Sequence, residues 1–257
     1  MMAKKACVIC LLVILLCGCV SMDATIGETA SASHSVSSTT TAGLILPTTL
    51  PTIPTTIPEV SVGPAPAVTM YAGAVEDYLL PLETYSDERL YGPEMVMIHF
   101  TSAVVLDRKD PYNIDLIRGI FLDYELSIHY IIERDGTIRC YIPEDRVAWH
   151  AGKGSWHLDE KYTDAMNQYA IGIEMVAMGS KSDMASYLSG KEYDALDQSL
   201  MGYTEEQYEA LSALVADLCL RYDIPMDRDH IIGHQEYAIK KRDPGELFDW
   251  SWVYART

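Results

Sequence analysis

Basic residues are few in this sequence. The 19 Lys and Arg residues stand against 37 Asp and Glu residues, which gives a formal net charge of −18 and an isoelectric point of about 4.6. Proteins that bind nucleic acid carry basic patches, so this balance argues against a nucleic-acid partner. The acidity alone identifies no partner, because acidic surfaces commonly serve solubility.

Cysteine is nearly absent from the body of the sequence. Four of the six cysteines stand within the first 19 residues: Cys7, Cys10, Cys17 and Cys19. Only Cys140, in an expected strand, and Cys219, in an expected helix, remain. This distribution excludes the disulfide framework of small secreted domains. We expect two buried free thiols, with a disulfide between them as the alternative.

The one long hydrophobic run is ACVICLLVILL, which is shorter than the roughly 20 residues that a membrane-spanning helix needs. It follows the basic stretch MMAKK and precedes LCGC, the order of a secretory signal. The end of this segment resembles a lipoprotein signal, in which the cysteine after a small residue is lipidated. We therefore predict a signal peptide at residues 1–18, lipidation of Cys19 and an extracytoplasmic protein anchored to the cell membrane. An uncleaved N-terminal anchor is the alternative.

Residues 19–69 are rich in Ser, Thr and Pro, as in SASHSVSSTTT and LPTTLPTIPTTIPEV. Such a stretch cannot bury a core, and repeated proline favours an extended chain. We predict a disordered linker, or stalk, that holds a domain away from the membrane. The domain itself is expected at residues 70–257, which is long enough for one sizeable core.

Apolar runs and helical periodicity alternate through the expected domain. Helices are expected within residues 110–126 and 204–222, and strands within 94–100, 168–178 and 229–234. A further pair of strands is expected within 126–142, joined by the Asp135-Gly136 turn. Strands interleaved with helices predict an α/β fold, with a single mixed central β-sheet flanked by helices.

Two segments differ in how clearly they are patterned. Residues 204–222 form the clearest helix, because Thr204 and Gln207 can make a capping box and Leu211, Val215 and Leu218 share one face. Residues 178–203 fit no regular element. They are interpreted either as a helical excursion at the rim of a site or as a plain connecting insertion.

Three residues of the domain suit a metal ion. His99 ends an apolar strand, where a titratable side chain is costly unless it has a partner. His234 follows a glycine, which lets the backbone turn tightly, and Asp243 is held towards an extended backbone by Pro244. Two histidines and one carboxylate would make a zinc site with a fourth position open for water. A satisfied core histidine is the alternative for His99.

The other histidines are expected outside this set. His230 and His234 have the spacing of helical zinc ligands, but residues 231–233 are typical of a strand and a turn, so at most one of the two should coordinate. His129 is expected near the site or buried, and not as a ligand. His157 is expected to have no part in the site.

Five segments, taken in order, resemble the type 2 N-acetylmuramoyl-L-alanine amidases: VMIHFTSA, SIHYIIERDGTI, RVAWHAGKGSW, NQYAIGIEM and IIGHQEYAIKKRDPGELFDW. These are zinc hydrolases of the bacterial cell wall, similar in fold to peptidoglycan recognition proteins and a phage lysozyme. The resemblance covers roughly residues 75–252, essentially the whole expected domain.

The resemblance implies roles for individual residues. The ligands of one zinc ion per domain would be His99, His234 and Asp243. Glu174 would accept the proton of the attacking water and pass it to the leaving amine, and Lys241 would stabilise the developing oxyanion. The alternatives are a structural salt bridge for Glu174 and a solvated lysine for Lys241.

Trp149 and His150 are further candidates, as substrate-binding residues of a groove. An aromatic face suits contact with sugar or peptide, although simple packing is the alternative for Trp149. The activity implied by the resemblance is hydrolysis of the amide bond between N-acetylmuramic acid and L-alanine in peptidoglycan or muropeptides. The alternatives are a non-catalytic recognition module of the same fold and a zinc peptidase that acts on wall peptides.

Overall fold

The structure is a computed structural model, and it describes residues 71–75 and 78–254. The predicted signal peptide, Cys19 and the predicted linker lie outside the described residues. Among the helices that are described, none has the length and apolar character needed to cross a membrane.

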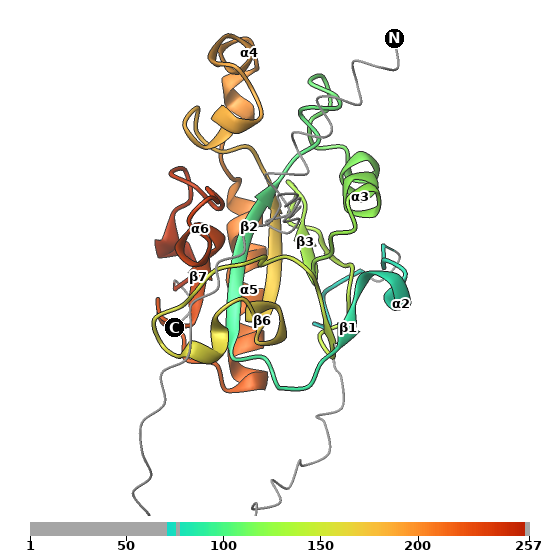
Figure 1. Cartoon of the computed structure of the whole chain (residues 1–257). Coiled ribbons are helices and arrows are strands. Elements are labelled where there is room, and N and C mark those ends of the chain that lie inside the picture. Colours follow the sequence, from blue (N-terminus) through green and yellow to red (C-terminus); the bar gives the residue numbers. More distant parts are fainter. Residues whose placement is uncertain (1–70, 76–77, 255–257) are drawn as a thin grey trace, which may run out of the picture. The chain divides into compact units, whose positions relative to one another are not determined.

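A five-stranded sheet forms the centre of the fold, in the order β4-β3-β6-β2-β7 (Figure 1). Its central strands are β2 (Met95–Thr101) and β6 (Ala170–Val176), which are parallel to each other and to their outer neighbours β3 (Tyr130–Ile132) and β7 (Ile231–Gly233). Only β4 (Ile138–Cys140) is antiparallel, to β3. The predicted mixed central sheet is confirmed.

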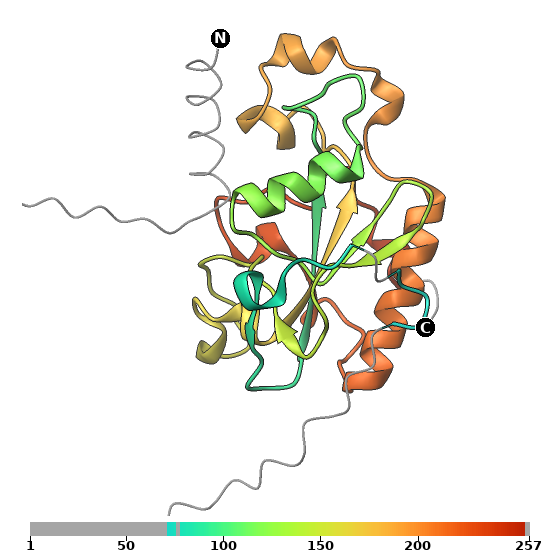
Figure 2. The ribbon, with the colours of Figure 1, turned by 90° about the vertical axis from the view of Figure 1, so that its right-hand side faces the viewer.

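Helices cover both faces of this sheet, as Figure 2 shows. The long helix α5 (Glu205–Tyr222) packs its apolar side on one face, against side chains such as Ile98 and Ile173. The shorter α3 (Ile114–Asp123) packs on the other face, through Ile117 and Phe121. The sheet is therefore the middle layer of three, which is the flanked architecture that the sequence predicts.

The local signals around α5 and the hairpin act as expected. Thr204 caps α5 by accepting the Gln207 N–H, and the Gln207 side chain accepts the Thr204 N–H in return. At the other end, Asp223 adopts a left-handed conformation with φ 55° and ends the helix. Between β3 and β4, Gly136 has φ 83°, a conformation that glycine adopts without strain.

The remaining elements are short. They are α2 (Leu82–Tyr85), β1 (Asp87–Glu88), β5 (Arg146–Val147), α4 (Gly190–Asp194), α6 (His234–Tyr237) and the 3-10 turns Glu160–Tyr162, Met166–Gln168, Asp183–Ser186, Gln198–Leu200 and Trp250–Trp252. β1 and β5 pair as a separate antiparallel ribbon. Cys140 and Cys219 are buried and free, as predicted.

Residues 178–203 fold into a compact lobe rather than a plain connection. Two 3-10 turns and α4 follow one another within it. Met184, Leu188 and Tyr193 form a small apolar cluster there together with Val104 from the segment after β2. This lobe lies beyond the ends of β2 and β6 in Figure 1, so the helical excursion is the correct one of the two interpretations.

A buried acid ties α5 to the sheet. Glu144 is 0% exposed, and its carboxylate accepts hydrogen bonds from the hydroxyls of Tyr130 and Tyr222. The guanidinium of Arg221 adds an ion pair, with Nη2 2.8 Å from Oε1. Since every partner comes from β3 or α5, this cluster fixes how the helix sits on the sheet.

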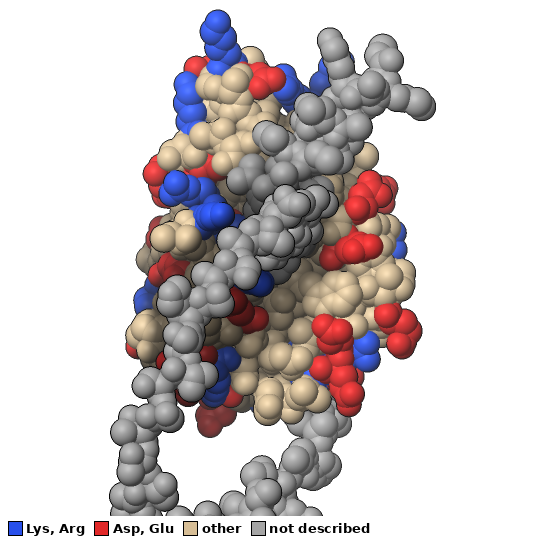
Figure 3. Space-filling model, in the orientation of Figure 1, with Lys and Arg blue, Asp and Glu red and all other residues tan. Residues whose placement is uncertain are grey.

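The charges on the surface are not evenly spread. On the face drawn in Figure 3, acidic side chains gather along the right-hand side, and a smaller group of basic side chains lies at the upper left.

Candidate metal centre and active site

Side chains alternate between the two faces of the sheet along β2 and β6, and this determines which residues share a face at the ends of these strands. Along β2, Val96 and Ile98 face α5, so Met97 and His99 point to the opposite face of the sheet. The register pairs His99 with Glu174 on β6, and both side chains therefore lie on the same face at the same level. The buried-strand pattern of the sequence thus delivers an imidazole and a carboxyl to one end of the sheet.

The other two candidate ligands come from the chain after β7. β7 runs parallel to β2 and pairs Gly233 with Ile98, so His234, the first residue of α6, emerges beside His99. The following loop returns Asp243 to the same place, where its carbonyl accepts the Gln235 N–H at 2.9 Å. The Asp243-Pro244 peptide bond is cis.

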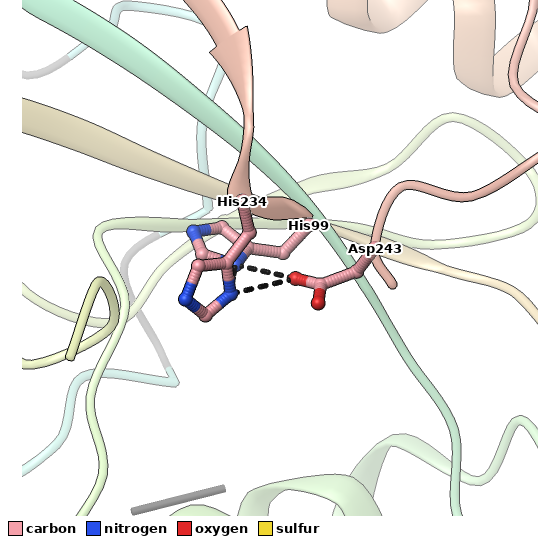
Figure 4. Close-up of side chains that lie close together, drawn as sticks. All are labelled: His99, His234 and Asp243. Atoms are coloured by element: carbon pink, nitrogen blue, oxygen red, sulfur yellow. Dashed lines mark hydrogen bonds and ion pairs between the residues drawn. The ribbon is translucent and has the colours of Figure 1, made fainter. Parts of the chain in front are cut away.

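The three side chains converge on one point, as Figure 4 shows. Nδ1 of His99 lies 2.8 Å from Oδ2 of Asp243, and Nδ1 of His234 lies 2.9 Å from the same oxygen. The two Nδ1 atoms are 3.0 Å apart. Both histidines are buried, while Asp243 is partly buried. The structure therefore brings together the three ligands that the sequence predicts, from three different segments.

The outer nitrogens of both rings are also engaged. Nε2 of His234 donates to the carbonyl of Ala151 at 2.9 Å, and Nε2 of His99 lies 3.0 Å from Nδ1 of His150. With Nε2 carrying the proton, each ring keeps a lone pair on the Nδ1 that faces the cluster. Outer-ring hydrogen bonds of this kind are the usual way in which proteins orient histidine ligands.

The electrostatics favour the forms that bind metal. Burial, and then the neighbouring ring of His234, lower the pKa of His99 to about 4. Burial by itself raises the pKa of Asp243, but His234 and His99 outweigh it and hold that pKa well below its usual range. At neutral pH the set therefore offers a neutral imidazole and a carboxylate, the protonation states that metal binding requires.

The donor set fits a zinc ion. Zinc bonds to nitrogen and oxygen are about 2.0–2.2 Å long, so tetrahedral ligand atoms stand about 3.3–3.6 Å apart. The three separations observed here, 2.8 to 3.0 Å, need to widen by about 0.3–0.8 Å, less than one ångström. Three protein ligands leave a fourth position for water or substrate, as in catalytic zinc sites.

Glu174 and Lys241 lie beside this cluster. Glu174 is half-buried, but its Oε2 is sealed from solvent and has no hydrogen-bond partner within the described residues. Burial, and then the charge of Asp243, raise the pKa of Glu174 well above its usual value, against the opposing charge of Lys241. The carboxyl group thus has an unused, buried oxygen beside the cluster.

A pocket that is open to solvent joins these residues into one site. Its lining includes His99, Trp149, His150, Glu174, Asp183, Ser186, Tyr187, His234, Lys240, Lys241, Arg242 and Asp243. Every residue that the sequence predicts for catalysis, metal binding or substrate contact is among them. Their roles remain predictions, but their common location is a property of the fold.

Trp149 and His150 face the pocket in different ways. The indole Nε1 of Trp149 donates to Oδ2 of Asp87 at 2.7 Å, which fixes the ring at the pocket wall. His150 instead stands against His99, and its own Nε2 is sealed from solvent without a hydrogen-bond partner among the described residues. The side chain of His150 therefore contacts a candidate metal ligand, His99.

The histidines that were expected outside the cluster lie outside it. His129 is fully buried, and its Nδ1 accepts the Gly172 N–H at 3.0 Å. His230 pairs with Asp227, and the exposed His157 pairs with Asp229.

Sequence reasoning left open whether the 178–203 lobe forms the rim of a site, and it named none of the lobe's residues. Asp183, Ser186 and Tyr187 line the pocket, although the lobe lies far along the chain from the Asp-Pro-Gly loop. It also missed Arg89, whose guanidinium reaches backbone carbonyls of Arg146 and Gln168 and approaches His129 Nε2 at 2.9 Å. No local pattern marks these residues, because their partners are set only by the folded chain.

Comparison with known proteins gives consistent relatives. The family model described as N-acetylmuramoyl-L-alanine amidase matches residues 89–246. The 1,6-anhydro-N-acetylmuramyl-L-alanine amidase AmpD of Enterobacter cloacae is 34% identical over 131 residues, which cover 51% of this chain and 56% of the relative. The N-acetylmuramoyl-L-alanine amidase AmiD of Escherichia coli is 27% identical over 188 residues, covering 69% of this chain and 59% of the relative.

The likeness extends to a solved fold. A crystal structure of a selenomethionine derivative of AmpD superposes with a TM-score of 0.51 at 25% sequence identity, over 72% of this chain and 95% of that one. The chain spans a little over half the length of the two curated relatives named above. On the family match across most of its described residues, this chain belongs to the N-acetylmuramoyl-L-alanine amidase family.

Proposed function

We propose that this protein is a zinc hydrolase that cleaves the amide bond between N-acetylmuramic acid and the L-alanine of peptidoglycan stem peptides. One observation carries the proposal: His99, His234 and Asp243 converge in the pocket that Glu174 also lines, and Oε2 of Glu174 has no hydrogen-bond partner in the described part of the chain. A ligand set beside a buried acid is the arrangement that amide hydrolysis requires. Membership of the amidase family supports the choice of bond.

The ligands would hold a single zinc ion through His99 Nδ1, His234 Nδ1 and an Asp243 oxygen. When bound, zinc polarises a carbonyl and lowers the pKa of water from 15.7 towards about 7. Glu174 would take the proton from the attacking water and deliver it to the nitrogen of the departing L-alanine. Its raised pKa makes the ionised carboxylate a stronger base than an ordinary glutamate, which suits taking a proton from water.

Lys241 would stabilise the negative charge that develops on the carbonyl oxygen. It lines the pocket and is close enough to Glu174 to lower the pKa of that group. Lys240 and Arg242 line the same pocket, so three consecutive basic residues stand at its wall together with the acidic Glu174, Asp183 and Asp243. The run of basic residues suits contact with carboxylate groups of a substrate.

The compartment follows from the sequence. A lipidated Cys19 and a Ser/Thr/Pro-rich linker at residues 19–69 would place the domain outside the cytoplasm, tethered to the cell membrane and within reach of wall polymer. We propose peptidoglycan or muropeptides as the substrate and the membrane as the partner of the N-terminal lipid.

The experiment uses the full-length chain, purified in mild detergent with zinc and incubated with a defined muramyl peptide. Mass spectrometry with and without a chelator should show free stem peptide beginning at L-alanine together with intact muramic acid, both abolished by the chelator. Products that keep the sugar–peptide bond would instead identify a zinc peptidase. Absence of cleavage with tight retention on wall polymer would identify a recognition module.

A further inference from the structure

A buried acid in the 178–203 lobe contacts the loop that carries the candidate ligand Asp243. Asp183 is 3% exposed and lies in the first 3-10 turn of the lobe, in a polar stretch of the sequence. A carboxylate withdrawn from water to this degree needs hydrogen bonds in return. Its partners show what it does in the fold.

Oδ2 of Asp183 links two distant segments. It accepts the backbone N–H of Ser180 at 2.9 Å, within the lobe, and the backbone N–H of Glu246 at 3.0 Å, directly after the Asp-Pro-Gly sequence. A second link runs beside it, because the hydroxyl of Ser180 lies 2.9 Å from Oε2 of Glu246. Residues 180 and 246 are therefore held together through one carboxylate oxygen and one hydroxyl.

Two glycines make room for this carboxylate. A Cβ on Gly245 would lie 2.5 Å from Oδ2 of Asp183, and Gly245 has φ +82°, which disfavours other residues. A Cβ on Gly179 would lie 2.6 Å from the Asp183 Cβ. A side chain at either position would displace Asp183. Both backbone segments therefore need glycine where they contact this residue.

The contact bears directly on the metal cluster. Glu246 stands three residues after Asp243, and the intervening Pro244 and Gly245 are both buried. The hydrogen bond from the Glu246 N–H to the Asp183 carboxylate fixes where the loop ends. It therefore also fixes where the Asp243 oxygen meets the two histidines. Tyr187, one turn further along the lobe, lines the pocket beside them.

We propose that Asp183 is a positioning residue, which holds the Asp-Pro-Gly loop so that Asp243 completes the metal site. The proposal rests on the proposed function for the nature of the ion. It also gives the 178–203 lobe a role: the lobe is a brace of the metal site as well as a wall of the pocket.

The test compares Asp183→Ala with Tyr193→Phe in the full-length chain. The Tyr193 hydroxyl donates to the carbonyl of Gly179 at 3.1 Å, so this control removes one buried hydrogen bond of the same lobe without touching the loop. Zinc affinity is measured by competition with a chromogenic chelator, and ligand geometry by the visible absorption of the Co²⁺-loaded protein. Circular dichroism checks the fold.

Asp183→Ala should weaken zinc binding by about 10-fold or more and alter the Co²⁺ spectrum, in the range of supporting residues around metal ligands. Asp183→Asn, which keeps an acceptor oxygen, should restore affinity to within about threefold of the wild type, since neutral acceptors also bond backbone N–H groups. Tyr193→Phe should leave both readouts unchanged.

Equal zinc affinity and an unchanged Co²⁺ spectrum in Asp183→Ala would overturn the proposal, as would an equal loss in Tyr193→Phe. If Asp183→Ala does not fold, Ser180→Ala takes its place, because it keeps the buried carboxylate and removes the Ser180 hydroxyl, which bonds to Glu246 at 2.9 Å and accepts the Asp183 N–H at 3.2 Å. A loss of about twofold or more is then expected, and no loss contradicts the proposal. A wild-type chain that binds no zinc at all would contradict the proposed function instead.

Discussion

Single hydrogen bonds set the orientation of each candidate ligand. His99 directs Nδ1 to the cluster because its Nε2 is engaged by His150, and His234 does the same because Ala151 accepts from its Nε2. A ring without its outer partner can rotate or change tautomer, which costs metal affinity. His150, which the sequence predicts as a substrate contact, thus has the candidate ligand His99 as its partner in the fold.

We expect His150→Ala to weaken zinc binding by about 10- to 100-fold while the protein stays folded. The measurement is zinc competition with a chelator, and a matched control is His157→Ala, which removes an exposed histidine that pairs with Asp229. Unchanged zinc affinity together with a raised KM would show that His150 acts on substrate and not through His99.

Glu174→Gln separates catalysis from metal binding. The amide keeps the size of the side chain but cannot carry the proton, so the rate of amide cleavage should fall by about 100- to 10,000-fold. Zinc content should stay at the wild-type level, because Glu174 is outside the converging set of three. Cleavage at the wild-type rate would assign the proton transfer to another group.

At the scale of elements, segments with a clear apolar pattern are predictable, including the short β7, whereas α2, β1 and β5 carry no such pattern. The sequence predicts β2, β6 and α5 because each carries its own pattern of burial and, for α5, its own cap. It predicts the metal set from His99 at the end of an apolar strand, from the glycine before His234 and the proline after Asp243, and from the resemblance to the amidases. The bonds of Asp183 were not predictable, since nothing local to residue 183 marks residue 246 as its partner.

The cap of α5 offers a test at this scale. Thr204→Ala removes the acceptor for the Gln207 N–H and a donor to the carbonyl of Arg134, so the free energy of unfolding should fall by about 1–2 kcal/mol. Leu220→Ala, at a side chain on the same helix that is 84% exposed, should change it by less than about 0.5 kcal/mol. Urea unfolding measures the free energy of unfolding of both variants. An equal decrease in Thr204→Ala and Leu220→Ala would contradict the capping role of Thr204.

For the molecule as a whole, a buried polar cluster adds to the hydrophobic packing between α5 and the sheet. Glu144 binds Arg221 of α5 together with Tyr130 of β3, so it connects helix to sheet far from the pocket. Removing one partner leaves a buried carboxylate without its counter-charge, which is costly even where the intact pair contributes little.

Arg221→Met should therefore lower the free energy of unfolding by about 3 kcal/mol. Arg108→Met is the matched control, because the Arg108–Glu192 pair is exposed and should contribute under about 1 kcal/mol. Denaturant midpoints compare the two. A loss in Arg221→Met no larger than in Arg108→Met would show that the cluster does not hold α5 in place.

The proposed activity of the whole molecule depends on a single zinc ion held by His99, His234 and Asp243. The most direct measurement is the metal content per chain of full-length protein by mass spectrometry of the elements, for the wild type and for the double variant His234→Ala/Asp243→Ala. We expect a metal content of one zinc per wild-type chain and almost no zinc in a double variant that remains folded. Full zinc occupancy in the double variant would contradict this expectation.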